Sequence, residues 1–134
     1  MPPSLHQLLL DEHRKIEARM ARLADAAEGA DAPTLIREWT GFEAALRAHL
    51  DVEEAQLFGR VAADERAGLL AEHRALRDRL DELGLEVELH QVRRATIDAF
   101  LAALRAHAAR EDGLLYRAAD EMPEPAQATF LAQL

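Results

Sequence analysis

The sequence contains no cysteine. This absence excludes disulfide scaffolds, zinc sites built from thiolates, iron–sulfur clusters held by cysteine, and thiol nucleophiles. Any metal site in this chain must therefore use histidine and carboxylate ligands. The sequence also lacks an apolar run of the ~20 residues that a membrane span needs, and residues 1–4 do not resemble a signal peptide. We therefore expect a cytoplasmic protein with no membrane partner.

Positive charge is scarce as well. Lysine and arginine together number 16 against 25 acidic residues, which gives a net charge of -9, and Lys15 is the only lysine. A nucleic-acid-binding protein usually shows the opposite balance or a basic stripe, so we expect no nucleic-acid partner. The length of 134 residues suits one domain over residues 1–134.

Glycine and proline are few, with 6 and 5 residues, and they lie mostly between long segments rich in Ala, Leu, Arg and Glu. Such a pattern is typical of helices separated by short breaks. Ser4 and Gln7 have the spacing of a capping box. We therefore predict a first helix from about Leu5 to Ala27 that stops at Gly29.

Comparable signals predict the next two helices. Asp31, with Pro33 in the first turn, opens a second helix that ends near Gly59. Asp64 caps a third helix, and Gly84 supplies its C-terminal stop.

The fourth predicted helix begins near Glu86 and fades before Pro123. A short last helix, about 125–134, is expected to pack across one end through Phe130 and Leu131. Because the connections are short, consecutive long helices should be antiparallel neighbours. The sequence thus predicts an all-α, up-down-up-down antiparallel four-helix bundle with a short C-terminal helix.

An internal repeat relates the two halves of the chain. The segment LDEHR at 10–14 recurs as LAEHR at 70–74, and FEAALRAH at 42–49 recurs as FLAALRAH at 100–107. Similar composition of two Ala/Leu/Arg-rich helices is an alternative explanation for the first pair of segments. Seven identities over eight positions, Phe and His included, favour a true repeat for the second pair.

The repeat preserves residues with metal-ligating side chains. Each half has a His on its first helix and a His-x-x-x-Glu pair, one turn apart, on its second helix. Counting along antiparallel helices at ~1.5 Å per residue places all of these side chains in one layer. The candidate ligands are His13, His49, Glu53, His73, His107 and Glu111.

Six inward polar side chains in an apolar layer need a physical explanation, because two buried carboxylates without partners would cost several kcal/mol each. Two divalent cations provide one, and nitrogen and oxygen ligands favour iron, with manganese and zinc as alternatives. Taken singly, each His has another interpretation as a hydrogen-bonded core residue, and each His–Glu pair as a surface pair. The common depth and the repeat favour the metal site.

These motifs, in this order, resemble the hemerythrin-like, or HHE cation-binding, domains over nearly the whole sequence. The resemblance implies a non-haem di-iron centre with the six residues above as ligands, which handles oxygen, nitric oxide or peroxide. Oxygen-carrying hemerythrins have a fifth His one turn after the third-helix His, where this sequence has Arg77. The pattern is therefore closer to bacterial di-iron proteins with four His and two carboxylates, linked to oxidative or nitrosative stress. Asp112 is an alternative last carboxylate, although the repeat favours Glu111.

Residues near the predicted layer suggest further roles. Glu17 and Arg77 each lie four positions after a ligand His, so we predict an ion pair beside the metals, with Glu17 able to ligate if the pair breaks. Two solvated side chains are the alternative. His6 is expected to be a core or access-channel residue, and His90, at the start of the fourth helix, structural or exposed.

Two function classes follow from the sequence. The first is a di-iron protein that binds or reacts with a small oxidant such as oxygen, nitric oxide or peroxide. The alternative is a non-catalytic iron- or metal-binding module that senses or holds metal and acts through a partner protein. A metal-free helical interaction domain is a third hypothesis, and it requires the six-residue layer to be coincidental.

Overall fold

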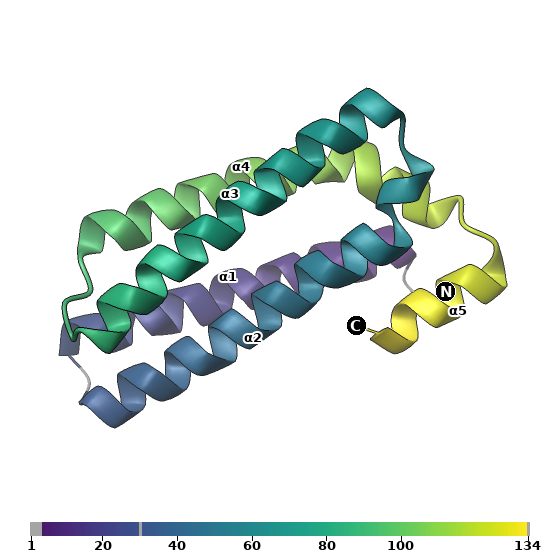
Figure 1. The fold of residues 1–134 in the computed structure, drawn as a ribbon. Coiled ribbons are helices and arrows are strands. Elements are labelled where there is room, and N and C mark those ends of the chain that lie inside the picture. Colours follow the sequence, from purple (N-terminus) through teal and green to yellow (C-terminus); the bar gives the residue numbers. More distant parts are fainter. Residues whose placement is uncertain (1–3, 30, 134) are drawn as a thin grey trace.

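The computed structural model describes residues 4–29 and 31–133, and within these residues it contains helices and no strand. Helix α1 packs against α2 and α4, and α3 packs against the same two helices, so α1 and α3 are diagonal (Figure 1). This confirms the predicted all-α bundle, with α5 lying across one end. The elements are α1 (Leu5–Gly29), α2 (Ala32–Gln56), the 3-10 helix η1 (Phe58–Arg60), α3 (Ala63–Glu88), α4 (Arg94–Asp120) and α5 (Glu124–Gln133).

The first two long helices begin as their sequences predict. At α1 the Ser4 backbone N–H donates to Gln7 Oε1, and the Gln7 N–H donates to Ser4 Oγ, both at 3.1 Å. At α2 the Asp31 carboxylate accepts a hydrogen bond from the Thr34 N–H at 2.9 Å. The expectation that Asp64 caps α3 is wrong. Asp64 lies inside the first turn of α3, where its negative charge interacts favourably with the helix dipole.

The predicted boundary between the third and fourth helices is also wrong. Helix α3 continues through Gly84 to Glu88, and α4 begins only at Arg94. Gly84 serves close packing, because a Cβ atom at this position would lie 3.0 Å from the Trp39 side chain. Two residues after the last helical residue, His90 has a positive φ of 56°, the left-handed conformation that commonly terminates helices. His90 is exposed, as expected, but it follows α3 and does not start α4.

Glu86, expected at the start of the fourth helix, is a buried residue near the end of α3. Its carboxylate accepts hydrogen bonds from the Arg93 backbone N–H at 2.8 Å and from the Thr96 hydroxyl at 2.7 Å. One helix thus supplies the cap of the next, which fixes the α3–α4 connection.

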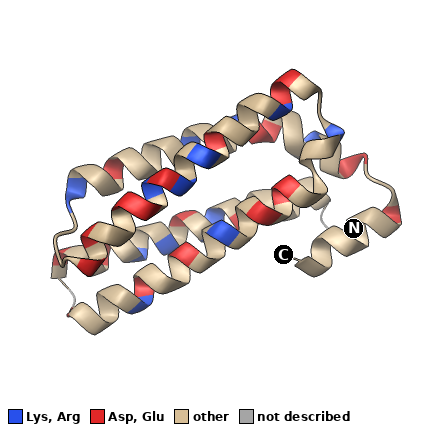
Figure 2. Ribbon diagram, in the orientation of Figure 1, with Lys and Arg blue, Asp and Glu red and all other residues tan. Residues whose placement is uncertain are grey.

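Two apolar clusters fill the interior. The larger lies toward the α1–α2 and α3–α4 turns, and there Phe42 and Phe100 pack edge to face with ring centroids 5.7 Å apart. The smaller lies at the other end, where α5 contributes the fully buried Phe130. The expectation that Leu131 also packs inward is wrong, since Leu131 is 42% exposed. Apart from Glu124 in its first turn, α5 carries no charged residue (Figure 2).

Candidate metal centre

The six predicted ligand residues form a polar layer between the two apolar clusters. On α1, for example, His13 lies between Leu9 of the smaller cluster and Ile16 of the larger one. Five of the six residues are buried, and the His13 side chain is 13% exposed. The structure therefore places in one layer the side chains that helix spacing alone placed at a common depth.

The six residues fall into two overlapping groups, in each of which four ligand atoms lie within 4.8 Å of one another. His13 and His49 belong to one group, and His73 and His107 belong to the other. Glu53 and Glu111 belong to both groups. Each half of the chain thus contributes a histidine pair, and the two carboxylates lie between the pairs.

Short distances show that the ligand atoms converge. The Nε2 atoms of His13 and His49 lie 3.0 Å apart, and His49 Nε2 lies 3.1 Å from a Glu53 oxygen. His73 Nε2 lies 3.0 Å from Glu111 Oε1 and 3.4 Å from Glu53 Oε1. His107 Nε2 also contacts Glu111 Oε1. Four imidazole nitrogens and two carboxylates therefore face one another inside the bundle.

Several of these atoms have no hydrogen-bond partner among the described residues. They are both carboxylate oxygens of Glu53, Oε2 of Glu111, Nε2 of His107 and Nδ1 of His49. An unsatisfied buried polar group costs about 1–3 kcal/mol, and more when it is charged. Bound divalent cations would accept lone pairs from the oxygens and from Nε2, so the residues present fit a metal centre.

The two buried carboxylates differ in their preference for a proton. Burial raises the pKa of Glu53, and the nearby Glu111 carboxylate raises it further. Burial opposes charge on Glu111 too, but the adjacent His107 and His13 imidazoles outweigh it and hold the pKa of Glu111 well below its usual range. The metal-free pair thus favours a proton on Glu53, which a cation would displace.

Two of the histidines are shifted in opposite directions. Burial, and then the electrostatic effect of the neighbouring His13, lower the pKa of His49 to about 3. Burial opposes a charge on His107 as well, but the Glu111 and Glu72 carboxylates outweigh it and raise the pKa of His107. His49 therefore remains neutral, which is the form that binds metals.

Sequence reasoning missed two carboxylates that hold the histidines of the second half. His73 Nδ1 donates to Glu54 Oε2 at 3.1 Å, and His107 Nδ1 donates to Glu72 Oε1 at 2.9 Å. Such outer carboxylates orient a metal-binding imidazole and make it a stronger ligand. A sequence signal for Glu72 existed, because a Glu precedes the His in both copies of the repeat.

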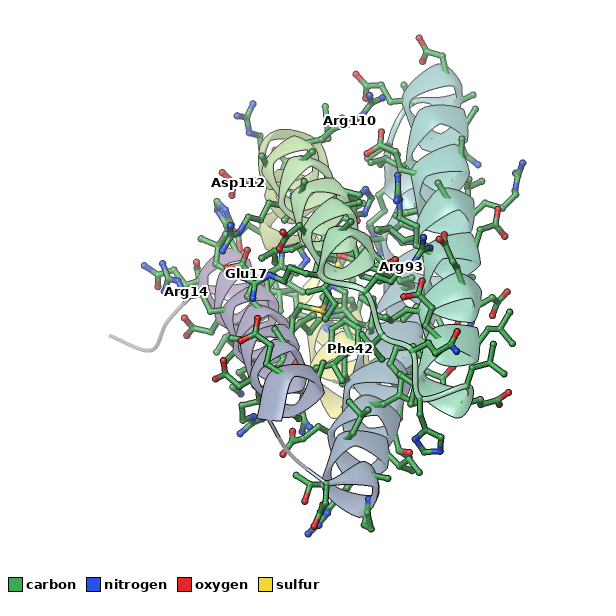
Figure 3. The ribbon with its side chains drawn as sticks, turned by 90° about the vertical axis from the view of Figure 1, so that its left-hand side faces the viewer. Arg14, Glu17, Phe42, Arg93, Arg110 and Asp112 are labelled. Atoms are coloured by element: carbon green, nitrogen blue, oxygen red, sulfur yellow. The ribbon has the colours of Figure 1, made fainter. Side chains whose placement is uncertain are left out.

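The predicted ion pair between Glu17 and Arg77 does not form. Glu17 accepts a hydrogen bond from Arg105 Nε of α4 at 2.9 Å, whereas Arg77 contacts Glu54 and donates to Asp51 of α2 at 2.7 Å. Helices α1 and α3 are diagonal, so each side chain meets the adjacent helix first. Figure 3 shows Glu17 at the side of α1.

The alternative carboxylate Asp112 lies outside the group of converging ligand atoms. Its side chain, which Figure 3 labels, is 49% exposed. The Asp112 Oδ1 atom lies 2.5 Å from His6 Nε2. The backbone N–H of His6 donates to Asp120 at 2.8 Å. The half-buried His6 therefore ties the start of α1 to the last turns of α4, apart from the polar layer.

A small cavity adjoins the layer. The cavity has a volume of about 20 Å³, which is enough for roughly one water-sized molecule. Apolar side chains make up much of its wall, and Glu17 is one of its lining residues. The lining residues are His13, Ile16, Glu17, Leu46, His49, Leu50, Leu104, His107 and Ala108.

Within the described residues, no helix combines the length and the apolar character required to cross a membrane.

Of three comparisons with known proteins, one agrees with this geometry. A search of curated proteins and a search of solved structures give no match. The family model for the hemerythrin HHE cation binding domain matches residues 4–119, a span that includes the whole polar layer. On this evidence the chain belongs to the hemerythrin HHE cation-binding domain family.

Proposed function

We propose that this chain is a non-haem di-iron protein that binds or reacts with a small oxidant, namely oxygen, nitric oxide or peroxide. The observation that carries the proposal is the pair of overlapping groups, each with two imidazoles and both shared carboxylates. Two cations would use the unpartnered atoms of this layer, whereas one cation would leave a histidine pair without a ligand role. Bound iron would supply the redox chemistry.

The donor set supports the choice of metal. Imidazole and carboxylate ligands without thiolates suit iron, and manganese and zinc are the alternatives. Six side chains supply fewer donors than two six-coordinate ions require, so positions remain for water or a small ligand. The absence of a histidine at position 77 leaves one donor fewer than in an oxygen carrier.

The protein residues divide their roles. The histidine pairs and the shared carboxylates hold the cations, while Glu54 and Glu72 orient His73 and His107. The apolar wall of the small cavity restricts the site to a ligand of a few atoms and disfavours charged molecules. We place this activity in the cytoplasm, in a response to oxidative or nitrosative stress.

Anaerobic loading with ferrous iron tests the proposal. We expect two irons per chain, and an absorption spectrum that changes when oxygen, nitric oxide or peroxide is added. His90→Ala is a matched control, because His90 is an exposed histidine in the α3–α4 connection and should leave iron content unchanged. Stoichiometric metal without reactivity would overturn the proposal in favour of a metal-binding module that acts through a partner protein. Absence of stoichiometric metal would favour a metal-free helical interaction domain.

A further inference from the structure

The repeat relates two surface grooves that reach the polar layer from opposite sides. One lies between α1 and α2 and reaches His49, and the other lies between α3 and α4 and reaches His107. Eight lining positions correspond, with an offset of 60 between α1 and α3 and of 58 between α2 and α4. Glu12 in the first groove is therefore the counterpart of Glu72 in the second.

In the α3–α4 groove the acidic residue holds the histidine. His107 Nδ1 donates to Glu72 Oε1 at 2.9 Å, and Arg110 Nε donates to Glu72 Oε2 at 3.1 Å. The arginine thereby keeps the Glu72 carboxylate against the imidazole. Its counterpart in the other groove is Val52, which cannot play this part.

In the α1–α2 groove the corresponding acidic residue, Glu12, is paired with a lysine and not with the histidine. Glu12 Oε1 accepts from Lys15 Nζ at 3.2 Å, on the same helix. His49 is 5% exposed, and its Nδ1 atom has no hydrogen-bond partner among the residues that the structure describes. A buried donor and a suitable carboxylate therefore line one groove without meeting.

We propose that Glu12 is the positioning residue of His49, and that on cation binding its carboxylate leaves Lys15 and accepts a hydrogen bond from His49 Nδ1. The inference rests on the proposed function, because an imidazole that gives its Nε2 lone pair to a cation carries its proton on Nδ1. The balance of interactions favours the exchange. The Lys15 side chain is 71% exposed, and exposed ion pairs contribute little, whereas a buried donor without an acceptor is costly.

Zinc is a suitable probe, because it is diamagnetic and suits this donor set. We expect Glu12→Ala to weaken one of two Zn²⁺ binding steps by about 10- to 100-fold in calorimetric titration. In the zinc-loaded, ¹⁵N-histidine-labelled wild type, we expect a slowly exchanging Nδ1 proton of His49 in the NMR spectrum. The same signal should be absent from the spectrum of Glu12→Ala. Glu12→Gln should restore that signal, since the Gln oxygen is also an acceptor. Lys15→Met should leave the signal in place and strengthen the same binding step.

Asp11→Ala is the matched control, because exposed Asp11 is paired with Arg14 three positions later, as Glu12 is with Lys15. We expect this variant to behave as the wild type in both measurements. Two wild-type Zn²⁺ affinities and an unchanged His49 signal in Glu12→Ala would overturn this inference and leave the proposed function standing. A wild-type chain that binds no Zn²⁺ or iron would overturn both.

Discussion

The two halves of the bundle carry the same ligand types but hold them differently. In the α3–α4 half, the outer nitrogens of His73 and His107 donate to Glu54 and Glu72. In the α1–α2 half, the outer nitrogen of His49 has no partner among the described residues. The pKa values of His49 and His107 also shift in opposite directions: burial and His13 lower that of His49, whereas Glu111 and the outer Glu72 raise that of His107. Equivalent ligands thus differ in the contacts that residues one layer further out make with them.

The cause of the difference lies in a few positions outside the polar layer. The second half has Arg110 beside its acidic residue, where the first half has Val52, and it has Ala75 where the first half has Lys15. One arginine directs Glu72 inward, whereas one lysine holds Glu12 at the surface. We therefore expect the His73–His107 side to bind its cation more tightly than the His13–His49 side.

The largest expected effect is the loss of cation binding in both halves of the bundle at once. Glu53 belongs to both ligand groups, so Glu53→Gln should abolish stoichiometric binding in both halves. Calorimetric titration with Zn²⁺ measures the effect, and metal analysis of the dialysed protein checks it. Glu43→Gln is the control, because Glu43 is a surface residue of α2 that pairs with Arg47. Retention of one tightly bound cation by Glu53→Gln would contradict the shared role.

The next effect concerns the stability of the metal-free chain. His49 has a pKa of about 3 when folded and 6.5 ordinarily, so the unfolded chain alone takes up a proton between these values. At about 1.4 kcal/mol per pKa unit, His49 should reduce stability by on the order of 3 kcal/mol between about pH 6.5 and pH 4. His107 acts oppositely. Its raised pKa gives stability that is full below its unfolded pKa and is lost as pH rises through its folded value.

Urea unfolding of the wild type, His49→Leu and His107→Leu at about pH 7 and about pH 5 measures these contributions. On acidification, the stability of the wild type relative to His49→Leu should fall, and relative to His107→Leu it should rise. Slopes of the same sign would contradict the opposed pKa shifts.

A smaller effect should be confined to one half. Because Glu54 fixes the orientation of His73, Glu54→Ala should weaken the affinity for one cation by about 10- to 100-fold. The other cation should bind with unchanged affinity. Two-step Zn²⁺ titration separates the two cases, and Asp81→Ala is the control, because exposed Asp81 pairs with Arg47 away from the ligands. Equal weakening of both steps would show that the halves are not independent.

The smallest effect compares two helix starts. Asp31→Ala removes the side-chain cap of α2 and should cost about 1 kcal/mol of unfolding free energy. Asp64→Ala at the start of α3 loses only a favourable interaction with the helix dipole, about 0.3 kcal/mol. Urea denaturation of the two variants measures both values. A larger loss at Asp64 would contradict the absence of a side-chain cap at α3.

Helical spacing carried most of the prediction. His49 and Glu53 share a face because they are four residues apart, and a straight helix converts residue number into depth. Helix ends were predicted where the cap is local, as at Ser4 and Asp31. The end of α3 was not predicted correctly. Gly84 does not end the helix; it leaves room for the Trp39 side chain, which lies on another helix.

The sequence by itself determined the four-helix bundle, the ligand types and the depth of the six residues. All three depend on local periodicity and on short connections that make neighbouring helices antiparallel. Only the tertiary structure decided that Glu17 meets Arg105, and that Glu54 and Glu72 hold two of the histidines. These contacts depend on which sides of neighbouring helices face each other, and that rotation is set by packing across the whole core.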